Sequence, residues 1–538
     1  MTDQLVVPPR RALIRVLVVG IVALLAASLL PGPAAEAKIG RNACPHRTNN
    51  TYQKLLECVT LEGVRGHQAK FQRIADANDG MRASGTDGYD RSADYVARLL
   101  RRAGYEVTRQ EFEFPFYQEL SSLLEQTAPT SVTYETTTFT FSGSGDVTAP
   151  VQGVDLSLDE PAASTSGCEV EDFADFEAGN IALIQRGACT FAIKAANAQE
   201  AGATAVIIFN TGVPGAEELF AGTLGNESVG VIEIPVIGAS FADGTALAQD
   251  GVEARVAAET IVETRTTENV IAESRRGDPD NVVMAGAHLD SVTEGPGIND
   301  NGSGVAAVLE TALMMAKVEP VNKLRFAFWG AEESGLIGSE EYVAALTPEE
   351  IEDIALYQNY DMIGSPNYVL MVYDADESTF AAEDFGVVVP DGSIAMEDLY
   401  EQFYTWQEVP YDDTGFSGRS DYQAFIDNDI PSGGLFTGAE VAKNEQQEAI
   451  WGGEAGVAFD PCYHEACDTY ENNADDALDV NSDAVAFSML TYAYSTEDVN
   501  GVRGRRVPGK PLDLPEPAGP EGTFATAEDG GDHAHDDH

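Results

Sequence analysis

One histidine and five acidic side chains follow successive apolar runs in the second half of the chain. They are His288, Asp290, Asp300, Glu332, Glu333 and Asp361. Such a cluster is electrostatically costly, because nearby carboxylates repel one another and raise each other's pKa. A bound divalent cation would remove that cost. Nitrogen and oxygen ligands without thiolate suit zinc best among the common metals, with cobalt and manganese as alternatives.

Each of these residues, taken alone, has a simpler explanation. A single histidine after a strand is commonly structural. Asp300, in the stretch INDNGSG, fits a helix N-cap, and Glu332 and Glu333 fit a solvated pair. These explanations account poorly for all of the residues together, so the metal site is the preferred interpretation.

The elements that must position these residues alternate between strands and helices. We expect strands at 281–287, at 323–329 and within 353–363, and helices at 304–318, 335–346 and 475–495. This order predicts an α/β fold, a mostly parallel mixed sheet with helices on both faces. Ligands of open parallel sheets bind outside the carboxyl ends of the strands, where the acidic residues are expected.

The histidine and carboxylates found so far are too few to hold two metal ions. Another histidine is therefore expected, and His464 is the best placed, in FDPCYHEACDTYEN (459–472). A small disulfide ring between its neighbours Cys462 and Cys467 would hold it rigidly. His46 and His67 lie far back in the chain without an acidic cluster and are expected to be structural.

Five motifs together resemble the zinc aminopeptidases of the M28 peptidase family, in particular secreted bacterial leucyl aminopeptidases and the aminopeptidase Y group. The motifs are GAHLDS, GINDNGSG, FWGAEESGLIGS, NYDMIG and CYHEACDTYEN. The resemblance covers most of residues 50–500. It implies the zinc exopeptidase fold and hydrolysis of the N-terminal peptide bond of peptides, with a preference for large apolar residues such as leucine. The stretch 179–212 also resembles a protease-associated domain, which that group carries as an insertion.

The resemblance also implies a ligand set for two zinc ions. His288 and Asp361 would hold one ion, Glu333 and His464 would hold the other, and Asp300 would bridge both. The glycines after Asp300 would let the chain turn back over the site.

Further roles follow from the same resemblance. Asp290 would fix the tautomer of His288, Glu332 would act as the general base, and Tyr463 would stabilise the oxyanion. The stretch SGRSDYQAF (417–425) resembles a family loop in which Tyr422 replaces a common histidine. Arg419 in this stretch is a candidate for positioning the substrate backbone.

The N-terminus predicts export. A basic start precedes the apolar run VLVVGIVALLAASLL (16–30), and PAAEA (33–37) offers small residues for cleavage after Ala37. An uncleaved anchor helix is the alternative. Six cysteines fit a secreted protein, and no C-x-x-C is present. The simplest of fifteen pairings joins near neighbours, namely Cys44 with Cys58, Cys168 with Cys189, and Cys462 with Cys467.

The expected domains are a signal peptide, an interrupted peptidase domain and a tail. The ranges are 1–37 for the signal, 38–125 and 266–500 for the peptidase domain, 126–265 for the protease-associated insertion, and 501–538 for a disordered acidic tail. The tail histidines His533, His535 and His538 fit a solvated tail better than a metal site.

The formal net charge of −58 comes from 89 acidic and 31 basic residues. It argues against nucleic acid as a partner, because phosphate contacts need a basic surface. We expect a monomer without a stable membrane partner that acts on peptides with a free N-terminus. The acidity fits a high-salt habitat and an ordinary acidic secreted protein equally. A calcium site among the many acids stays open but cannot be placed from the sequence.

Other functions compatible with the same fold are a carboxypeptidase, a glutaminyl cyclase and a non-catalytic binding protein. The presence of His288 together with the pair Glu332 and Glu333 favours two metal ions over the single zinc of a cyclase. The presence of every ligand position and of the base argues against a binding protein.

Overall fold

The structure is a computed structural model that describes residues 41–524. The predicted signal peptide (1–37) and the tail histidines lie outside the described residues. Within 41–524, no helix is long and apolar enough to cross a membrane.

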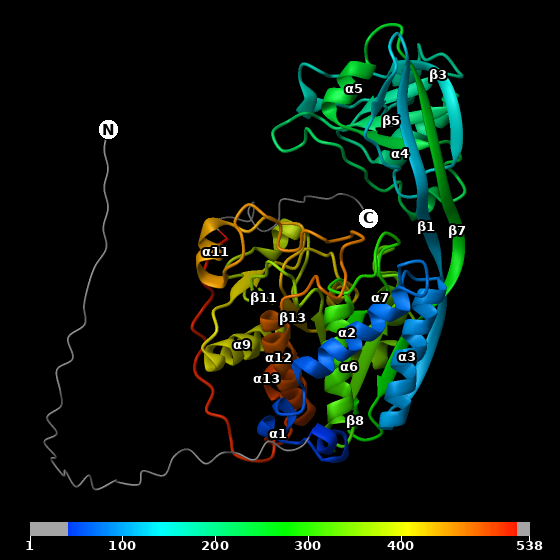
Figure 1. Ribbon diagram of the computed structural model, residues 1–538. Coiled ribbons are helices and arrows are strands. Elements are labelled where there is room, and N and C mark those ends of the chain that lie inside the picture. The colour runs from blue at the N-terminus through cyan, green and yellow to red at the C-terminus, as the bar shows by residue number, and fades with distance from the viewer. Residues whose placement is uncertain (1–40, 525–538) are drawn as a thin grey trace, which may run out of the picture. The chain divides into compact units, whose positions relative to one another are not determined.

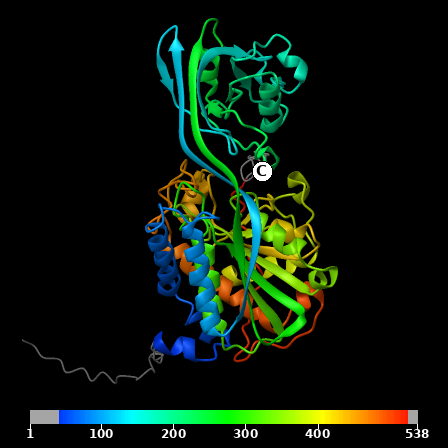
Figure 2. The same ribbon diagram turned by 90° about the vertical axis from the view of Figure 1, so that its right-hand side faces the viewer.

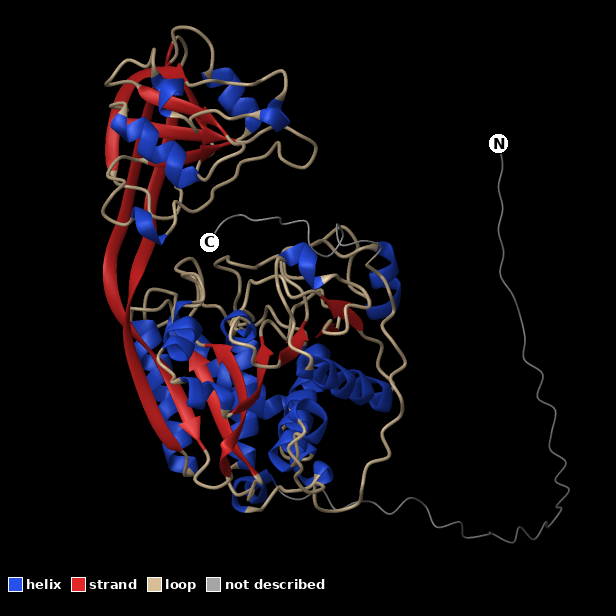
Figure 3. Ribbon diagram, turned by 180° about the vertical axis from the view of Figure 1, so that it is seen from behind, coloured by secondary structure: helices blue, strands red, loops and turns tan. Residues whose placement is uncertain are grey.

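A mixed sheet, the main sheet, organises the second half of the chain and is flanked by helices (Figure 3). Its strands are β7 (Glu253–Glu273), β8 (Asp278–His288), β9 (Asn322–Trp329), β10 (Ile354–Tyr360), β11 (Met371–Tyr373), β12 (Asp412–Thr414) and β13 (Ser432–Phe436), in the order β12-β11-β13-β10-β8-β9-β7. The four central strands, β13, β10, β8 and β9, run parallel. On either side of these four, β7 pairs antiparallel with β9 and β11 pairs antiparallel with β13, and β12 forms the edge beyond β11. The predicted mostly parallel mixed sheet is therefore confirmed.

Helices cover both faces of the main sheet. They are α1 (Tyr52–Leu56), α2 (Leu61–Ala75), α3 (Asp87–Ala103), α6 (Gly302–Met315), α7 (Ile337–Ala344), α8 (Pro348–Glu352), α9 (Gly392–Gln407), α10 (Tyr422–Ile426), α11 (Glu445–Trp451), α12 (Asp475–Tyr494) and α13 (Glu497–Asn500), with the 3-10 turns η1 (Arg41–His46) and η5 (Ala382–Phe385). Successive side chains of β8 point to opposite faces. Val283 and Ala285 pack with α2, α3, α6, α9 and α12, whereas Val282 and Met284 pack with α7 and α10.

The elements between β1 and β7 in the chain form an inserted domain. It contains β2 (Val132–Tyr134), β3 (Gly145–Gly153), β4 (Ile181–Gln185), β5 (Ala205–Phe209), β6 (Val236–Ala239), α4 (Phe191–Glu200), α5 (Phe241–Leu247), and the 3-10 turns η2 (Pro161–Ala163), η3 (Val170–Phe173) and η4 (Asn226–Ser228). The order β4, α4, β5 confirms the strand, turn, helix and strand expected for 179–212. The β-like run at 131–141 forms only the short strand β2.

Two long strands connect the inserted domain to the main sheet. β1 (Glu106–Ala128) and β7 pair antiparallel over almost their whole lengths (Figures 1 and 2). The start of β7 also pairs with β3, and its end pairs with β9. The domain borders expected at 126 and 266 therefore fall inside continuous strands.

All three expected cysteine pairs are bonded in the structure. They are Cys44–Cys58, Cys168–Cys189 and Cys462–Cys467. The first ties η1 to the turn after α1, the second lies in the inserted domain, and the third closes a ring around His464.

The expectation of a disordered tail from residue 501 is wrong for the part that the structure describes. Thr523 and Phe524 are buried. The backbone N–H groups of Gly522 and Thr523 donate to the buried carboxylate of Asp412, at 3.1 and 3.0 Å. Phe524 packs against Phe380. Low apolar content suggested disorder, but one aromatic anchor and a buried acceptor hold this segment in place.

Candidate metal centre

The predicted site residues meet at the carboxyl ends of the central strands. His288 is the last residue of β8, Glu332 and Glu333 follow β9, and Asp361 follows β10. Asp300 lies two residues before α6. Asn301, not Asp300, caps that helix, because its side chain accepts from the N–H of Gly304 at 3.0 Å. The carboxylate of Asp300 is therefore free to face the histidines.

Asp300 presents one carboxylate oxygen to each of two histidines from distant parts of the chain. Its Oδ1 lies 3.1 Å from His288 Nε2, and its Oδ2 lies 3.3 Å from His464 Nε2. Asp361 Oδ1 lies 3.3 Å from the same nitrogen of His288. Glu333 Oε2 lies 3.1 Å from the same nitrogen of His464. Asp300 thus lies between the two histidines. Two sets of three residues have oxygen or nitrogen atoms close enough together to hold a metal ion, namely His288 with Glu332 and Asp361, and His288 with Asp300 and Glu333.

The charges of these residues depend on each other. Burial lowers the pKa of His288 and His464, but the neighbouring carboxylates outweigh burial and raise both pKa values well above the usual one. Burial, with Asp300 nearby, raises the pKa of Glu333 to about 7. Burial opposes ionisation of Asp300, yet hydrogen bonds from both histidines bring its pKa below the usual value. The centre therefore favours bound positive charge.

The donor set fits zinc. The site offers two imidazoles and several carboxylates and no thiolate. Imidazoles and carboxylates are common zinc ligands. Glu333 Oε1 and Asp361 Oδ1 are buried without a hydrogen-bond partner among the described residues. A cation next to these oxygens would remove the cost of leaving them unsatisfied. The His464 side chain is 42% exposed, whereas that of His288 is 1% exposed, so the centre opens to solvent on the His464 side.

The backbone is left-handed at three positions of the site. Ala331, Met362 and His464 have φ values of 54°, 45° and 56°. Non-glycine residues in this region are uncommon, and such strain often occurs at functional sites. Ala331 turns the chain between β9 and Glu332, and Met362 turns it directly after Asp361.

The remaining predicted residues surround the same centre. Asp290 Oδ1 lies 3.7 Å from His288 Nδ1, and Glu332 Oε2 lies 3.8 Å from His288 Nε2. Burial raises the pKa of Glu332 well above its usual value. The ring of Tyr463 stacks on that of His464 at 3.8 Å between centroids. Arg419 Nη2 donates to the Tyr463 hydroxyl at 3.3 Å, and its Nη1 pairs with Glu440.

Several supporting residues were not predicted from the sequence. Asp468 accepts from the backbone N–H groups of Asn299 and Asp300, at 2.8 and 2.9 Å. Ser420 donates to Asp361 at 2.6 Å. Fully buried Arg82 donates to the backbone carbonyls of Leu289, Pro296 and Gly297. Asp468 lies within CYHEACDTYEN, so that motif carried a signal, whereas nothing in the sequence around Arg82 points to the site.

Other residues considered from the sequence have separate surroundings. His67 pairs with Glu310 at 3.1 Å and contacts the hydroxyl of Tyr95 at 2.7 Å. The hydroxyl of Tyr422 accepts from the N–H of Gly418 at 2.8 Å. Both arrangements are structural.

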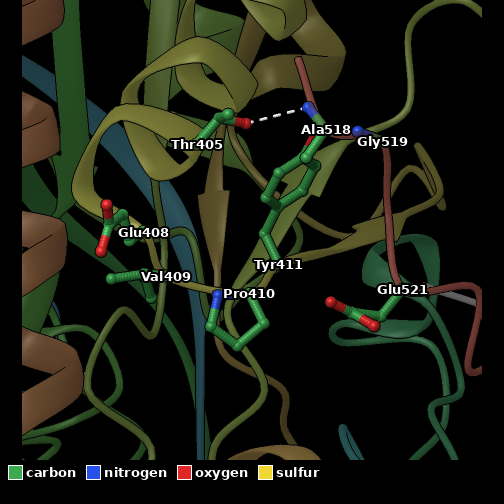
Figure 4. A pocket seen from close by; sticks show the side chains of 8 residues that line it. All are labelled: Thr405, Glu408, Val409, Pro410, Tyr411, Ala518, Gly519 and Glu521. Atoms are coloured by element: carbon green, nitrogen blue, oxygen red, sulfur yellow. Dashed lines mark hydrogen bonds between the residues drawn. The ribbon is translucent and has the colours of Figure 1, made fainter. Parts of the chain in front are cut away.

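A pocket of about 280 Å³ lies at the end of α9, beside the C-terminal segment (Figure 4). It is lined by Thr405, Glu408, Val409, Pro410, Tyr411, Ala518, Gly519 and Glu521. None of the metal-centre residues lines it, so it does not bear on the chemistry of that centre.

Comparison with protein families places two domains in the chain. The model of peptidase family M28 matches residues 269–489, and that of the PA domain matches residues 147–247. The first range holds every proposed metal ligand. The second lies within the inserted domain.

Two curated relatives match most of the chain. An aminopeptidase of Pseudomonas aeruginosa is 48% identical and covers 83% of both chains. A probable leucine aminopeptidase 2 of Aspergillus fumigatus is 42% identical and covers 78% of this chain and 80% of the relative.

Two solved structures have the same fold. An aminopeptidase from Aneurinibacillus sp. strain AM-1 has a TM-score of 0.63 at 26% identity, and covers 89% of this chain and 100% of its own. A zinc aminopeptidase from Bacillus subtilis has a TM-score of 0.57 at 25% identity, and covers 80% of this chain and 94% of its own.

Proposed function

Because this chain belongs to peptidase family M28 and is a metallo-aminopeptidase, we propose that it works with two zinc ions that share Asp300. The observation that carries the proposal is the position of this carboxylate, with one oxygen near His288 and the other near His464. A carboxylate placed between two imidazoles suits a bridging ligand. His288 and Asp361 would complete the ligands of one ion, and Glu333 and His464 those of the other.

Zinc, when bound, lowers the pKa of a water molecule and polarises the scissile carbonyl. The protein's own groups then move the protons. Glu332 has no ion-pair partner other than His288 among the described residues, and its carboxylate faces the same centre. It is the general base that takes the proton of the attacking water and passes it to the leaving amine nitrogen.

Tyr463 and Arg419 act on the substrate side. The phenol of Tyr463 donates a hydrogen bond to the oxyanion that forms at the carbonyl carbon. Arg419 holds this phenol through its guanidinium, and its second nitrogen is anchored by Glu440. Asp290 faces the outer ring nitrogen of His288 and sets the tautomer that leaves Nε2 free for the metal.

The substrate is the free N-terminus of a peptide, with a preference for large apolar residues such as leucine. The leucine aminopeptidase among the relatives supports this preference. The three disulfides support a secreted protein, because such bonds persist in oxidising compartments.

The test compares leucine p-nitroanilide with its N-acetyl form, using the purified zinc-loaded protein. We expect release of nitroaniline from the free amine only, and loss of activity after chelation with recovery on adding zinc. Zinc content measured by mass spectrometry should be two per chain.

The other outcomes separate the alternatives. Release of the C-terminal residue from peptides with a free C-terminus, instead of nitroaniline from the free amine, would support the carboxypeptidase. Cyclisation of N-terminal glutamine with one zinc per chain would support the cyclase. Absence of both zinc and turnover would support a binding protein.

A further inference from the structure

A second group of carboxylates shares no residue with the metal centre. Glu397 and Glu401 lie one turn apart on α9, and Asp413 lies on β12. One possible ligand oxygen from each lies within 4.8 Å of the other two. The three residues are 4%, 9% and 0% exposed. Three carboxylates are therefore held together out of solvent.

The charges that act most strongly on this group are all negative. Burial, with Asp376 and Asp374 nearby, raises the pKa of Glu397 to about 9. Burial, helped by acidic neighbours, raises the pKa of Glu401 and of Asp413 to about 7. None of the charged side chains that act most strongly on the pKa values of these three acids is basic.

Asp413 has an oxygen that no donor in residues 41–524 satisfies. Its Oδ2 accepts from the hydroxyls of Thr379 and Ser378, whereas its Oδ1 is buried without a partner. Glu397 is fixed differently, because its Oε2 accepts from the backbone N–H groups of Ala375 and Asp376, at 3.0 and 2.9 Å. A buried acceptor without a donor is costly. A cation at this point would supply the missing partner.

We infer that Glu397, Glu401 and Asp413 bind a Ca²⁺ ion separately from the zinc centre. The donors are all carboxylate oxygens, which hard cations prefer, and calcium accepts six to eight oxygen ligands in flexible geometry. Zinc would favour nitrogen or sulfur in such a site. Asp374 and Asp376 form an adjoining acidic group with Glu397 and add to the negative field.

The site joins three parts of the fold. Glu397 and Glu401 belong to α9, and Asp413 belongs to the edge strand β12. Tyr411 interacts with Glu401, and its phenol accepts from the N–H of Gly519 at 2.8 Å, in the C-terminal segment. Figure 4 shows Tyr411 beside this segment. Calcium would therefore stabilise the packing of α9, β12 and this segment, without a part in the chemistry at the zinc centre.

The experiment uses the zinc-loaded protein after removal of calcium. Its melting temperature is measured against added CaCl2, with MgCl2 and NaCl at matched ionic strength as controls for general screening. We expect a saturable rise of several degrees with calcium and a much smaller rise with the other salts. Terbium, a luminescent substitute for calcium, should be sensitised by Tyr411 and displaced by calcium. Zinc content should not change.

Two variants test the assignment, and a third variant serves as the matched control. Asp413→Asn keeps the shape and removes the charge, so it should melt at or above the calcium-free wild type and lose the calcium-dependent rise. Glu401→Gln should lose the rise as well, which covers the case that Asp413→Asn does not fold. Asp384→Asn, at an exposed acid of η5, should keep the full rise. A wild type whose calcium response equals that with MgCl2, or a folded Asp413→Asn protein that keeps the full rise, would overturn the inference.

Discussion

Two adjacent glutamates after β9 point to different tasks. Glu333 lies 3.1 Å from His464, whereas Glu332 lies 3.8 Å from His288. If Glu332 is the general base, Glu332→Gln should lower kcat by at least about 100-fold, because the amide cannot take a proton. Zinc content should stay at the wild-type level. Stopped assays with leucine p-nitroanilide and mass spectrometry of bound zinc measure both quantities.

The neighbouring positions provide the controls for that substitution. Glu333→Gln removes a proposed ligand and should therefore lose bound zinc together with activity. Glu341→Gln, at an exposed position of α7, should change neither. A Glu332→Gln protein with near wild-type kcat would exclude this residue as the base, and one that loses zinc would make it a ligand.

The sequence predicted the side chains that face the centre better than those that hold them. His288 and Asp361 could be found because a rare or charged residue follows an apolar run at the end of a strand, and Asp300 because it lies in a glycine-rich turn before a helix. Asp468 and Arg82 bind backbone groups of a loop remote from them in the chain. A bond to a backbone group depends on tertiary distance and leaves no periodic pattern in the sequence.

At the scale of elements, the alternation of strands and helices was predictable because each apolar run is short and ends at a turn residue. The length of β1 was not. Only 105–114 alternates clearly, yet the strand continues to Ala128. It continues because β1 leads into the inserted domain and β7 leads out of it, and the two strands pair with each other. That pairing joins segments far apart in the sequence.

The disulfide ring around His464 should contribute to metal binding as well as to stability. In the chain-entropy model, a ring with a sequence separation of 5 stabilises by about 2 kcal/mol, and the Cys168–Cys189 ring, with a separation of 21, by about 3 kcal/mol. The Cys462→Ser, Cys467→Ser protein should nevertheless lose roughly tenfold or more in zinc affinity, because His464 is no longer held.

The matched control removes the other ring. The Cys168→Ser, Cys189→Ser protein should melt at a lower temperature but keep wild-type zinc affinity and kcat. Zinc titrations with a competing chelator, together with calorimetry, measure the two effects. Equal zinc affinities for the two double variants would mean that the ring does not position His464.

In the inserted domain, buried Lys194 should make stability depend on pH. Its Nζ donates to the carbonyls of Ser166 and Gln185, and burial lowers its pKa to about 8. The folded state therefore releases this proton at lower pH than the unfolded state, so this residue's contribution to stability rises from about pH 8 to the unfolded pKa of about 10.4. Lys194→Met removes that rise.

Calorimetry of both proteins between pH 7 and pH 10 measures the effect. The advantage of Lys194→Met over the wild type should be largest near pH 7 and shrink as the pH increases. Parallel curves for the two proteins would mean that Lys194 has the same pKa in the folded and unfolded states. Lys317→Met, on the surface after α6, serves as a control for the loss of one positive charge.

The whole molecule carries far more negative than positive charge, with 89 acidic and 31 basic residues. A folded chain of this kind repels itself, since compaction brings like charges together. The Debye length falls from about 30 Å at 0.01 M salt to about 8 Å at 0.15 M, so added salt weakens this repulsion. We therefore expect the melting temperature to rise steeply with NaCl over this range and then level off.

Sucrose separates this effect from general exclusion of the additive from the protein surface. At matched osmolality it should raise the melting temperature less than NaCl does, because it does not screen charge. The measurement is made with zinc present and calcium absent, so that binding of divalent ions does not contribute. A melting temperature that is flat from 0.01 M to 0.15 M NaCl would mean that the acidic groups are already compensated in the folded state, through raised pKa values or bound cations, and that the net charge costs the fold little.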